Sequence, residues 1–140
     1  MSTKIFVNLP VKDLTGSIEF FTGLGFRYEP HFTDENGACI VIGADSYVML
    51  LVEPFFRTFT GKERADTTGT AETIVALGVE GRQRVDELVD KALATGGAPF
   101  NDRTEEDGMY GRSFQDPDGH LWEVFSMPPP AVPPAAATAG

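Results

Sequence analysis

The chain has 140 residues, the length of one domain or of two small units that share a core. Its formal net charge of −10 and its pI near 4.5 argue against nucleic acid or an anionic membrane as a partner. The single cysteine, Cys39, cannot form an internal disulfide, and no apolar stretch suits a signal core or a membrane span. We therefore expect a cytoplasmic protein that binds neither nucleic acid nor membrane.

The first part of the chain reads as a strand, a helix and three further strands. Apolar and polar residues alternate over residues 4–11, which predicts a half-buried strand. Asp13 is a suitable N-cap for the helix that follows, and Gly23 marks the end of that helix. Three strand-like runs come next, at residues 26–33, 38–43 and 46–53.

Residues 54–70 interrupt this pattern. The segment mixes Phe55, Phe56 and Phe59 with basic residues. Because a loop with so many aromatic rings rarely stays in water, we expect either a short helix packed on the core or a lid over a cleft.

The initial order of elements then returns. A second alternating run covers residues 72–79, an amphipathic helix covers residues 82–94, and short strands are predicted near residues 98–101, 109–115 and 120–126. This internal repeat predicts an α+β fold of two tandem βαβββ units that form one curled mixed sheet around a shared cleft. We place the units at about residues 4–53 and 72–127, within a single domain of residues 1–127. Residues 128–140, rich in Pro and Ala, are predicted to be a flexible tail.

The last predicted strand carries one acid among large apolar residues. It follows a turn of sequence Asp-Pro-Asp-Gly and places Leu121, Glu123 and Phe125 on one face. A carboxylate in that position has three possible roles. It is satisfied structurally, for example by Arg112; it is the counter-ion of a ligand; or it is a general base with a raised pKa.

At this level of detail the chain resembles the vicinal oxygen chelate superfamily, which includes glyoxalase I, bleomycin-resistance proteins and extradiol dioxygenases. The resemblance is carried by residues 6–14, 17–21 and 24–26 near the start and by residues 114–123 near the end. It covers nearly the whole chain up to Met127 and implies the tandem-unit fold and a homodimer.

The same resemblance implies where a metal would be held. In the metal-dependent members, each unit supplies one ligand from its first strand and one from its last strand. Those positions fall on Phe6, Met49, Ile74 and Glu123 in this chain. Only Glu123 suits a divalent ion, whereas a metal site normally needs about three protein ligands. We therefore expect no metal and no other cofactor.

The remaining residues of the predicted cleft indicate what kind of ligand binds there, but they do not indicate a reaction. An aromatic wall with one acid favours an amphipathic or cationic aromatic small molecule, although the side chains could instead fill the space. The sequence thus predicts a metal-free binding protein similar to the drug-sequestering members. The alternative is a metal-dependent glyoxalase-like lyase or isomerase, or a dioxygenase, and Glu123 is the best catalytic candidate. The predicted ligand-binding residues are Phe6, Asn8, Tyr47, Met49, Leu51, Ile74, Leu121, Glu123 and Phe125.

Overall fold

The computed structural model describes residues 3–127, so the predicted tail at residues 128–140 lies outside the described residues. The first unit consists of β1 (Ile5–Val11), α1 (Leu14–Gly23), β2 (Arg27–Glu29), the 3-10 turn η1 (Pro30–Phe32), β3 (Gly37–Gly43) and β4 (Ser46–Val52). The second consists of β5 (Ile74–Val79), α3 (Arg82–Ala94), β6 (Thr104–Glu106), β7 (Met109–Gln115) and β8 (Leu121–Ser126). Helix α2 (Glu53–Thr60) lies between the two units.

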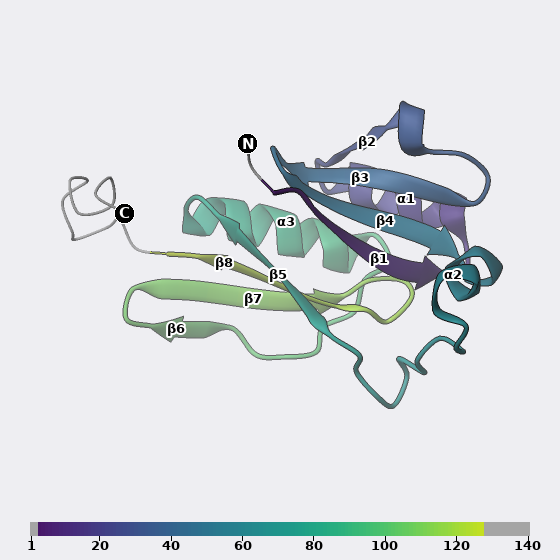
Figure 1. Ribbon diagram of the computed structural model, residues 1–140. Helices are drawn as coiled ribbons and strands as arrows, with labels where there is room; N and C mark the ends of the chain where they lie inside the picture. The colour runs from purple at the N-terminus through teal and green to yellow at the C-terminus, as the bar shows by residue number, and fades with distance from the viewer. Residues whose placement is uncertain (1–2, 128–140) are drawn as a thin grey trace.

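The strands form two four-stranded mixed sheets with the same topology. Their orders are β1-β4-β3-β2 and β5-β8-β7-β6, and the first strand of each unit runs parallel to the last. The other pairs in each sheet are antiparallel. The predicted α+β class and the two tandem βαβββ units are confirmed. Hydrogen bonds group the strands into two sheets, and the first strand of each unit, β1 or β5, is one of the two edge strands of its sheet (Figure 1).

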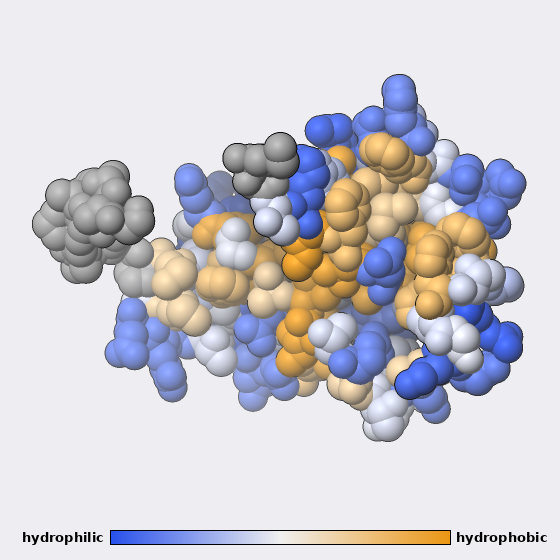
Figure 2. Space-filling model, viewed as in Figure 1, coloured by the Kyte–Doolittle hydropathy of each residue, from blue (hydrophilic) through white to orange (hydrophobic). Residues whose placement is uncertain are grey.

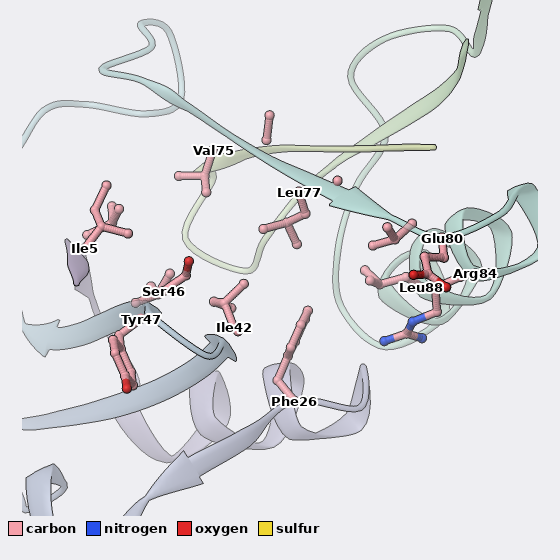
Figure 3. Close-up of a pocket in the computed structure, with 16 residues that line it drawn as sticks. Ile5, Phe26, Ile42, Ser46, Tyr47, Val75, Leu77, Glu80, Arg84 and Leu88 are labelled. Atoms are coloured by element: carbon pink, nitrogen blue, oxygen red, sulfur yellow. The ribbon is translucent and has the colours of Figure 1, made fainter. Parts of the chain in front are cut away.

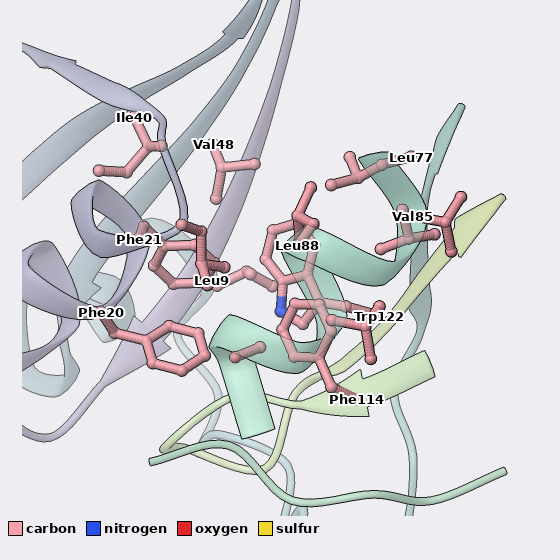
Figure 4. Close-up of a cluster of buried hydrophobic side chains, with 14 of the residues drawn as sticks. Leu9, Phe20, Phe21, Ile40, Val48, Leu77, Val85, Leu88, Phe114 and Trp122 are labelled. Carbon is pink, nitrogen blue, oxygen red and sulfur yellow. The ribbon is translucent and has the colours of Figure 1, made fainter. Parts of the chain in front are cut away.

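Helices α1 and α3 cover the same side of both sheets (Figure 1). This follows from the alternation along each strand, because one set of side chains is apolar and buried beneath the helices. We call the opposite side the open face, although Cys39 and Leu51 of the first sheet are buried on it, at 0% and 2% exposure. In Figure 4, Phe20 and Phe21 of α1 lie beside Phe114 and Trp122 of the second unit. The ring centroids of Phe21 and Trp122 are 5.1 Å apart. One apolar core therefore spans both units.

The Phe-rich segment forms a helix, which was one of the two predicted alternatives. Helix α2 contacts β1 and β4, keeps Phe55 and Phe56 half-buried and leaves Phe59 exposed. It ends at Gly61, whose φ of 67° is the left-handed conformation that glycine adopts most easily. The chain then continues as an irregular connection to β5.

The strand predicted at residues 98–101 was wrong. Ala98 makes only an isolated bridge to Gln115, and Pro99 has no N–H to continue a ladder. The strand forms instead at β6, because Asp107 and Gly108 adopt φ values of 53° and 78° and turn the chain directly into β7. Similarly, the run predicted at residues 26–33 is shortened because Pro30 begins the turn η1.

Candidate functional site

The open face of the second sheet carries Glu123. Strand β8 points Leu121, Glu123 and Phe125 away from α3, and all three side chains are half-buried. Within residues 3–127 the Glu123 carboxylate has neither a hydrogen-bond partner nor an ion-pair partner. Arg112, considered above as its counter-ion, lies on the helix-covered face, where its Nη1 atom is 2.9 Å from Asp86 and 2.8 Å from Asp90.

The four positions that the family resemblance assigns to metal ligands lie at equivalent places in the two units. Met49 is paired with Asn8, two residues after Phe6, and Glu123 is paired with Ala76, two residues after Ile74. Of the four positions, only Glu123 supplies an oxygen ligand. In the described part of the chain, no three His, Cys, Asp or Glu side chains come together in a way that could hold a metal ion. This donor set does not fit a divalent metal.

The nine predicted ligand-binding residues are not gathered into one cavity. Asn8 lines a cavity of about 270 Å³ beneath α2, Glu123 lines one of about 100 Å³, and Tyr47 lines a crevice of about 590 Å³ between the two units. The other six line none of these three spaces: Phe6, Met49, Leu51, Ile74, Leu121 and Phe125. Their role in binding stays a prediction.

Apolar side chains are exposed where the first strands of the two units approach each other. Ile5, Phe6 and Ile74 are 58%, 47% and 50% exposed, and the Phe6 ring stacks on Tyr47 with centroids 4.7 Å apart. Figure 2 shows an apolar area near the middle of the face on which Figure 1 places β1 and β5. An exposed apolar surface of this kind is suited to binding a flat apolar molecule or another protein surface.

A buried histidine joins the two units, and sequence reasoning missed its partners. His120 is 3% exposed; its Nδ1 atom is 2.7 Å from Glu72 Oε1 and its Nε2 atom is 2.7 Å from the carbonyl oxygen of Pro10. Both partner atoms are oxygens that can accept, and an imidazolium ring donates to both of them at once. Burial alone would lower the pKa of His120, but Asp116, Pro10 and Glu72 outweigh it and raise the pKa.

The Asp-Pro-Asp-Gly turn is tied into both units. The Asp116 carboxylate accepts hydrogen bonds from the backbone of Asp118 and His120 and from Trp122 Nε1, at 2.9 to 3.0 Å. Its burial raises the pKa of Asp116. Asp118 accepts from the Lys12 backbone N–H at 2.9 Å and from Ser17 Oγ at 3.3 Å, at the start of α1. The turn therefore has a structural role.

Comparisons with known proteins agree with this architecture. The family profile described as the Glyoxalase/Bleomycin resistance protein/Dioxygenase superfamily matches residues 5–124. Among solved structures, the chain is similar to hypothetical protein SA1046 from S. aureus, with 31% sequence identity, a TM-score of 0.76, and coverage of 90% of this chain and 94% of that one. No match was found among curated protein sequences.

Two more distant structures share the fold. A glyoxalase/bleomycin resistance protein/dioxygenase family enzyme from Burkholderia phytofirmans PsJN has 15% identity and a TM-score of 0.77, covering 91% of this chain and 100% of that one. The fosfomycin resistance protein FosX from Listeria monocytogenes has 18% identity and a TM-score of 0.64, covering 94% and 96%. Separately, none of the helices in residues 3–127 has the length and apolar character needed to span a membrane.

Proposed function

Because the chain belongs to the glyoxalase/bleomycin resistance protein/dioxygenase superfamily, we propose that it is a small-molecule-binding protein that works without a catalytic metal. Its ligand is an amphipathic or cationic aromatic molecule held on the open face of the sheets. The side chains proposed to contact it are Phe6, Asn8, Tyr47, Met49, Leu51, Ile74, Leu121, Glu123 and Phe125.

The observation that carries this proposal is the Glu123 carboxylate, which has no hydrogen-bond or ion-pair partner within residues 3–127. It is half-buried between Leu121 and Phe125, so it is partly removed from water without compensation by a protein cation. A cationic group on a ligand would supply that compensation, and an aromatic body would cover the apolar side chains around it. The net charge of −10 favours the approach of a cation.

A thermal-shift titration tests the role of Glu123. We expect berberine, a flat aromatic cation, to raise the melting temperature, since a ligand that binds only the folded state stabilises it. Replacing Glu123 by Gln should weaken binding about fivefold, the equivalent of about 1 kcal/mol for a half-exposed charge pair. Glu35→Gln, an exposed position with the same charge change, is the matched control. If both variants lose the same binding affinity, the loss comes from the change in net charge, and Glu123 has no specific role.

Metal content separates this proposal from its enzymatic alternative. The protein would be purified without chelator and without a metal-binding tag, and then analysed by mass spectrometry of the elements. We expect no divalent metal at stoichiometric level. Stoichiometric, tightly held Ni, Zn, Fe or Mn would contradict the proposal and would favour a metal-dependent lyase, isomerase or dioxygenase.

We also propose that the protein is a homodimer in the cytoplasm. The support for the dimer is the exposed apolar surface at the sheet edges, and the support for the compartment is a single, buried and unpaired cysteine. Light scattering should give twice the chain mass at micromolar concentration. Phe6→Lys should produce monomers, whereas Phe32→Lys, at an exposed site on the turn η1, should not. A wild-type monomer would contradict the dimer.

A further inference from the structure

A crevice of about 590 Å³ lies between the two units; Glu123 does not line it, and Tyr47 is the one residue that it shares with the proposed open-face site. In Figure 3, Val75 and Leu77 of β5 form one wall, and Phe26 and Ile42 of the first unit form the other. This volume falls within the range of about 300–1,000 Å³ that is typical of small-molecule sites. The cavity is large enough to hold an organic ligand.

The crevice exists because β1 and β5 belong to different sheets and are not paired with each other. Val75 and Leu77 alternate with Ile74 and Ala76, so they point to the helix-covered side, opposite to the side chains of the open face. Leu88 of α3 adds to this apolar lining. Protein interiors are normally close-packed, and an apolar body in this space would restore the missing contacts.

One end of the crevice is charged. Arg84, near the start of α3, lines it together with Glu80 (Figure 3). Arg84 Nη2 donates to the carbonyl oxygen of Leu24 at 3.2 Å, and in the described part of the chain the guanidinium has no carboxylate partner. Its other N–H groups remain for a ligand. Arg84 is half-buried whereas Glu80 is exposed, so water screens the positive charge less than the negative one.

We propose that this crevice binds an amphipathic carboxylate whose aromatic or branched apolar body lies between the units and whose carboxylate pairs with Arg84. The planar fork of a guanidinium matches a carboxylate, and Phe26 and Leu77 offer apolar contacts to the body. The negative net charge of the protein opposes binding of an anion only weakly, because acidic groups more than about 8 Å from the bound carboxylate are largely screened at physiological ionic strength. The ligand differs in sign from the cation proposed for the open face, and the two sites stand or fall separately.

Three probes with the same body and different heads test the assignment by isothermal titration calorimetry: 4-phenylbutanoate, 4-phenylbutanol and 4-phenylbutylamine. We expect the acid to bind at least fivefold more tightly than the alcohol and the amine to bind most weakly, because Arg84 favours an anionic head. Equal affinities for acid and alcohol, or preference for the amine, would overturn the proposal, as would the absence of binding by the acid.

Variants at the charged end give a second test. Arg84→Gln should weaken 4-phenylbutanoate binding at least fivefold and leave the alcohol unchanged, while Glu80→Gln should tighten the acid about two- to threefold by removing a repulsive charge. Arg27→Gln, at an exposed position on β2, is the matched control. If Arg84→Gln and Arg27→Gln have the same effect, the acid responds only to overall charge and the assignment fails.

Methyl NMR locates the bound probe. The acid should shift the methyl signals of Val75, Leu77 and Leu88 in the crevice and leave those of Leu121 on the open face unchanged. Shifts at Leu121 without shifts at Leu77 would place the probe on the open face and would refute the crevice site. Because the readout is positional, failure here leaves the berberine experiment on Glu123 unaffected.

Discussion

His120 illustrates how a single side chain couples charge to stability. Its ring is held between Glu72 on the connection to β5 and the Pro10 carbonyl at the end of β1, with Asp116 close enough to raise its pKa. A histidine with a raised folded-state pKa stabilises the fold fully below the unfolded value of about 6.5. That contribution is lost as the pH rises through the folded-state pKa.

The free energy of unfolding should therefore fall as pH is raised above about 6.5. Urea denaturation of the wild type and of His120→Gln at pH 6 to 9 measures this. We expect the variant to lose about 1–3 kcal/mol at pH 6, because Glu72 and Pro10 lose a buried partner, and to show a flatter pH profile. His31→Gln, at an exposed position, is the control. A steep profile retained in His120→Gln would assign the effect to another group.

The sequence predicted the position of some functional side chains but not the contacts of others. Glu123 and its apolar neighbours followed from strand alternation, and the structure places all three on the predicted face. The contacts of His120 had no signal in the sequence, because Glu72 and Pro10 lie 48 and 110 residues away from it. Arg84 carried no local signal at all, since its role depends on how the two units are set against each other.

At the scale of elements, local patterns predicted most helices and strands. Helices α1 and α3 begin and end close to the predicted limits, because Asp13 accepts a hydrogen bond from the Gly16 N–H and apolar residues recur at helical spacing. Strand β6 was misplaced because the Asp107–Gly108 turn was not recognised as a two-residue hairpin connection. Residues 98–101 also contain Pro99 and Asn101, which are unfavourable in a strand.

The β6–β7 turn makes a prediction at the same scale. Gly108 has a φ of 78°, a conformation that costs an L-residue about 1–2 kcal/mol, so Gly108→Ala should destabilise the protein by that amount. Gly69→Ala is a matched control, since Gly69 has open space around it and no left-handed φ. Urea denaturation should show a change within about 0.5 kcal/mol for the control. Equal effects in both variants would argue against a strained hairpin.

The core shared between the units decides how the whole molecule unfolds. Phe21 is 1% exposed and Trp122 is fully buried, and their contact crosses from one unit to the other. We therefore propose that the predicted domain of residues 1–127 unfolds as a single cooperative unit. Trp122 fluorescence and far-UV circular dichroism should follow the same transition in urea. Two separated transitions would mean that the units fold independently.

The same contact predicts a large mutational effect. Phe21→Ala should cost about 3–5 kcal/mol, because it removes a buried ring from the middle of the core. Phe32→Ala, at a ring that is 66% exposed, should change stability by less than about 0.5 kcal/mol. Denaturation midpoints of the two variants, measured with the fluorescence of Trp122, provide the comparison. A small effect of Phe21→Ala would show that the core repacks without its central ring.

The architecture of the whole molecule was predictable because the same order of strands and helix occurs twice in the sequence. The arrangement of the two units was not, since it depends on contacts between residues far apart, such as Phe21 with Trp122. For the same reason only three of the nine predicted cleft residues, Asn8, Tyr47 and Glu123, line any of the three cavities described above, each a different one, and the crevice beside Arg84 had no signature in the sequence.

Asp118 makes contacts between the two copies of the repeat that the matching residue of the first copy does not make. From the second copy it completes the start of α1 in the first, through Lys12 and Ser17, whereas Asp45 at the matching corner of the first copy pairs with Lys4 of its own copy. The two copies therefore share a backbone topology but differ in these side-chain contacts. A chimera assembled from two first copies would keep the Asp13 cap of the helix but would lack the hydrogen bonds that Lys12 and Ser17 donate to Asp118, so the contact between its two copies at this helix would have to be redesigned.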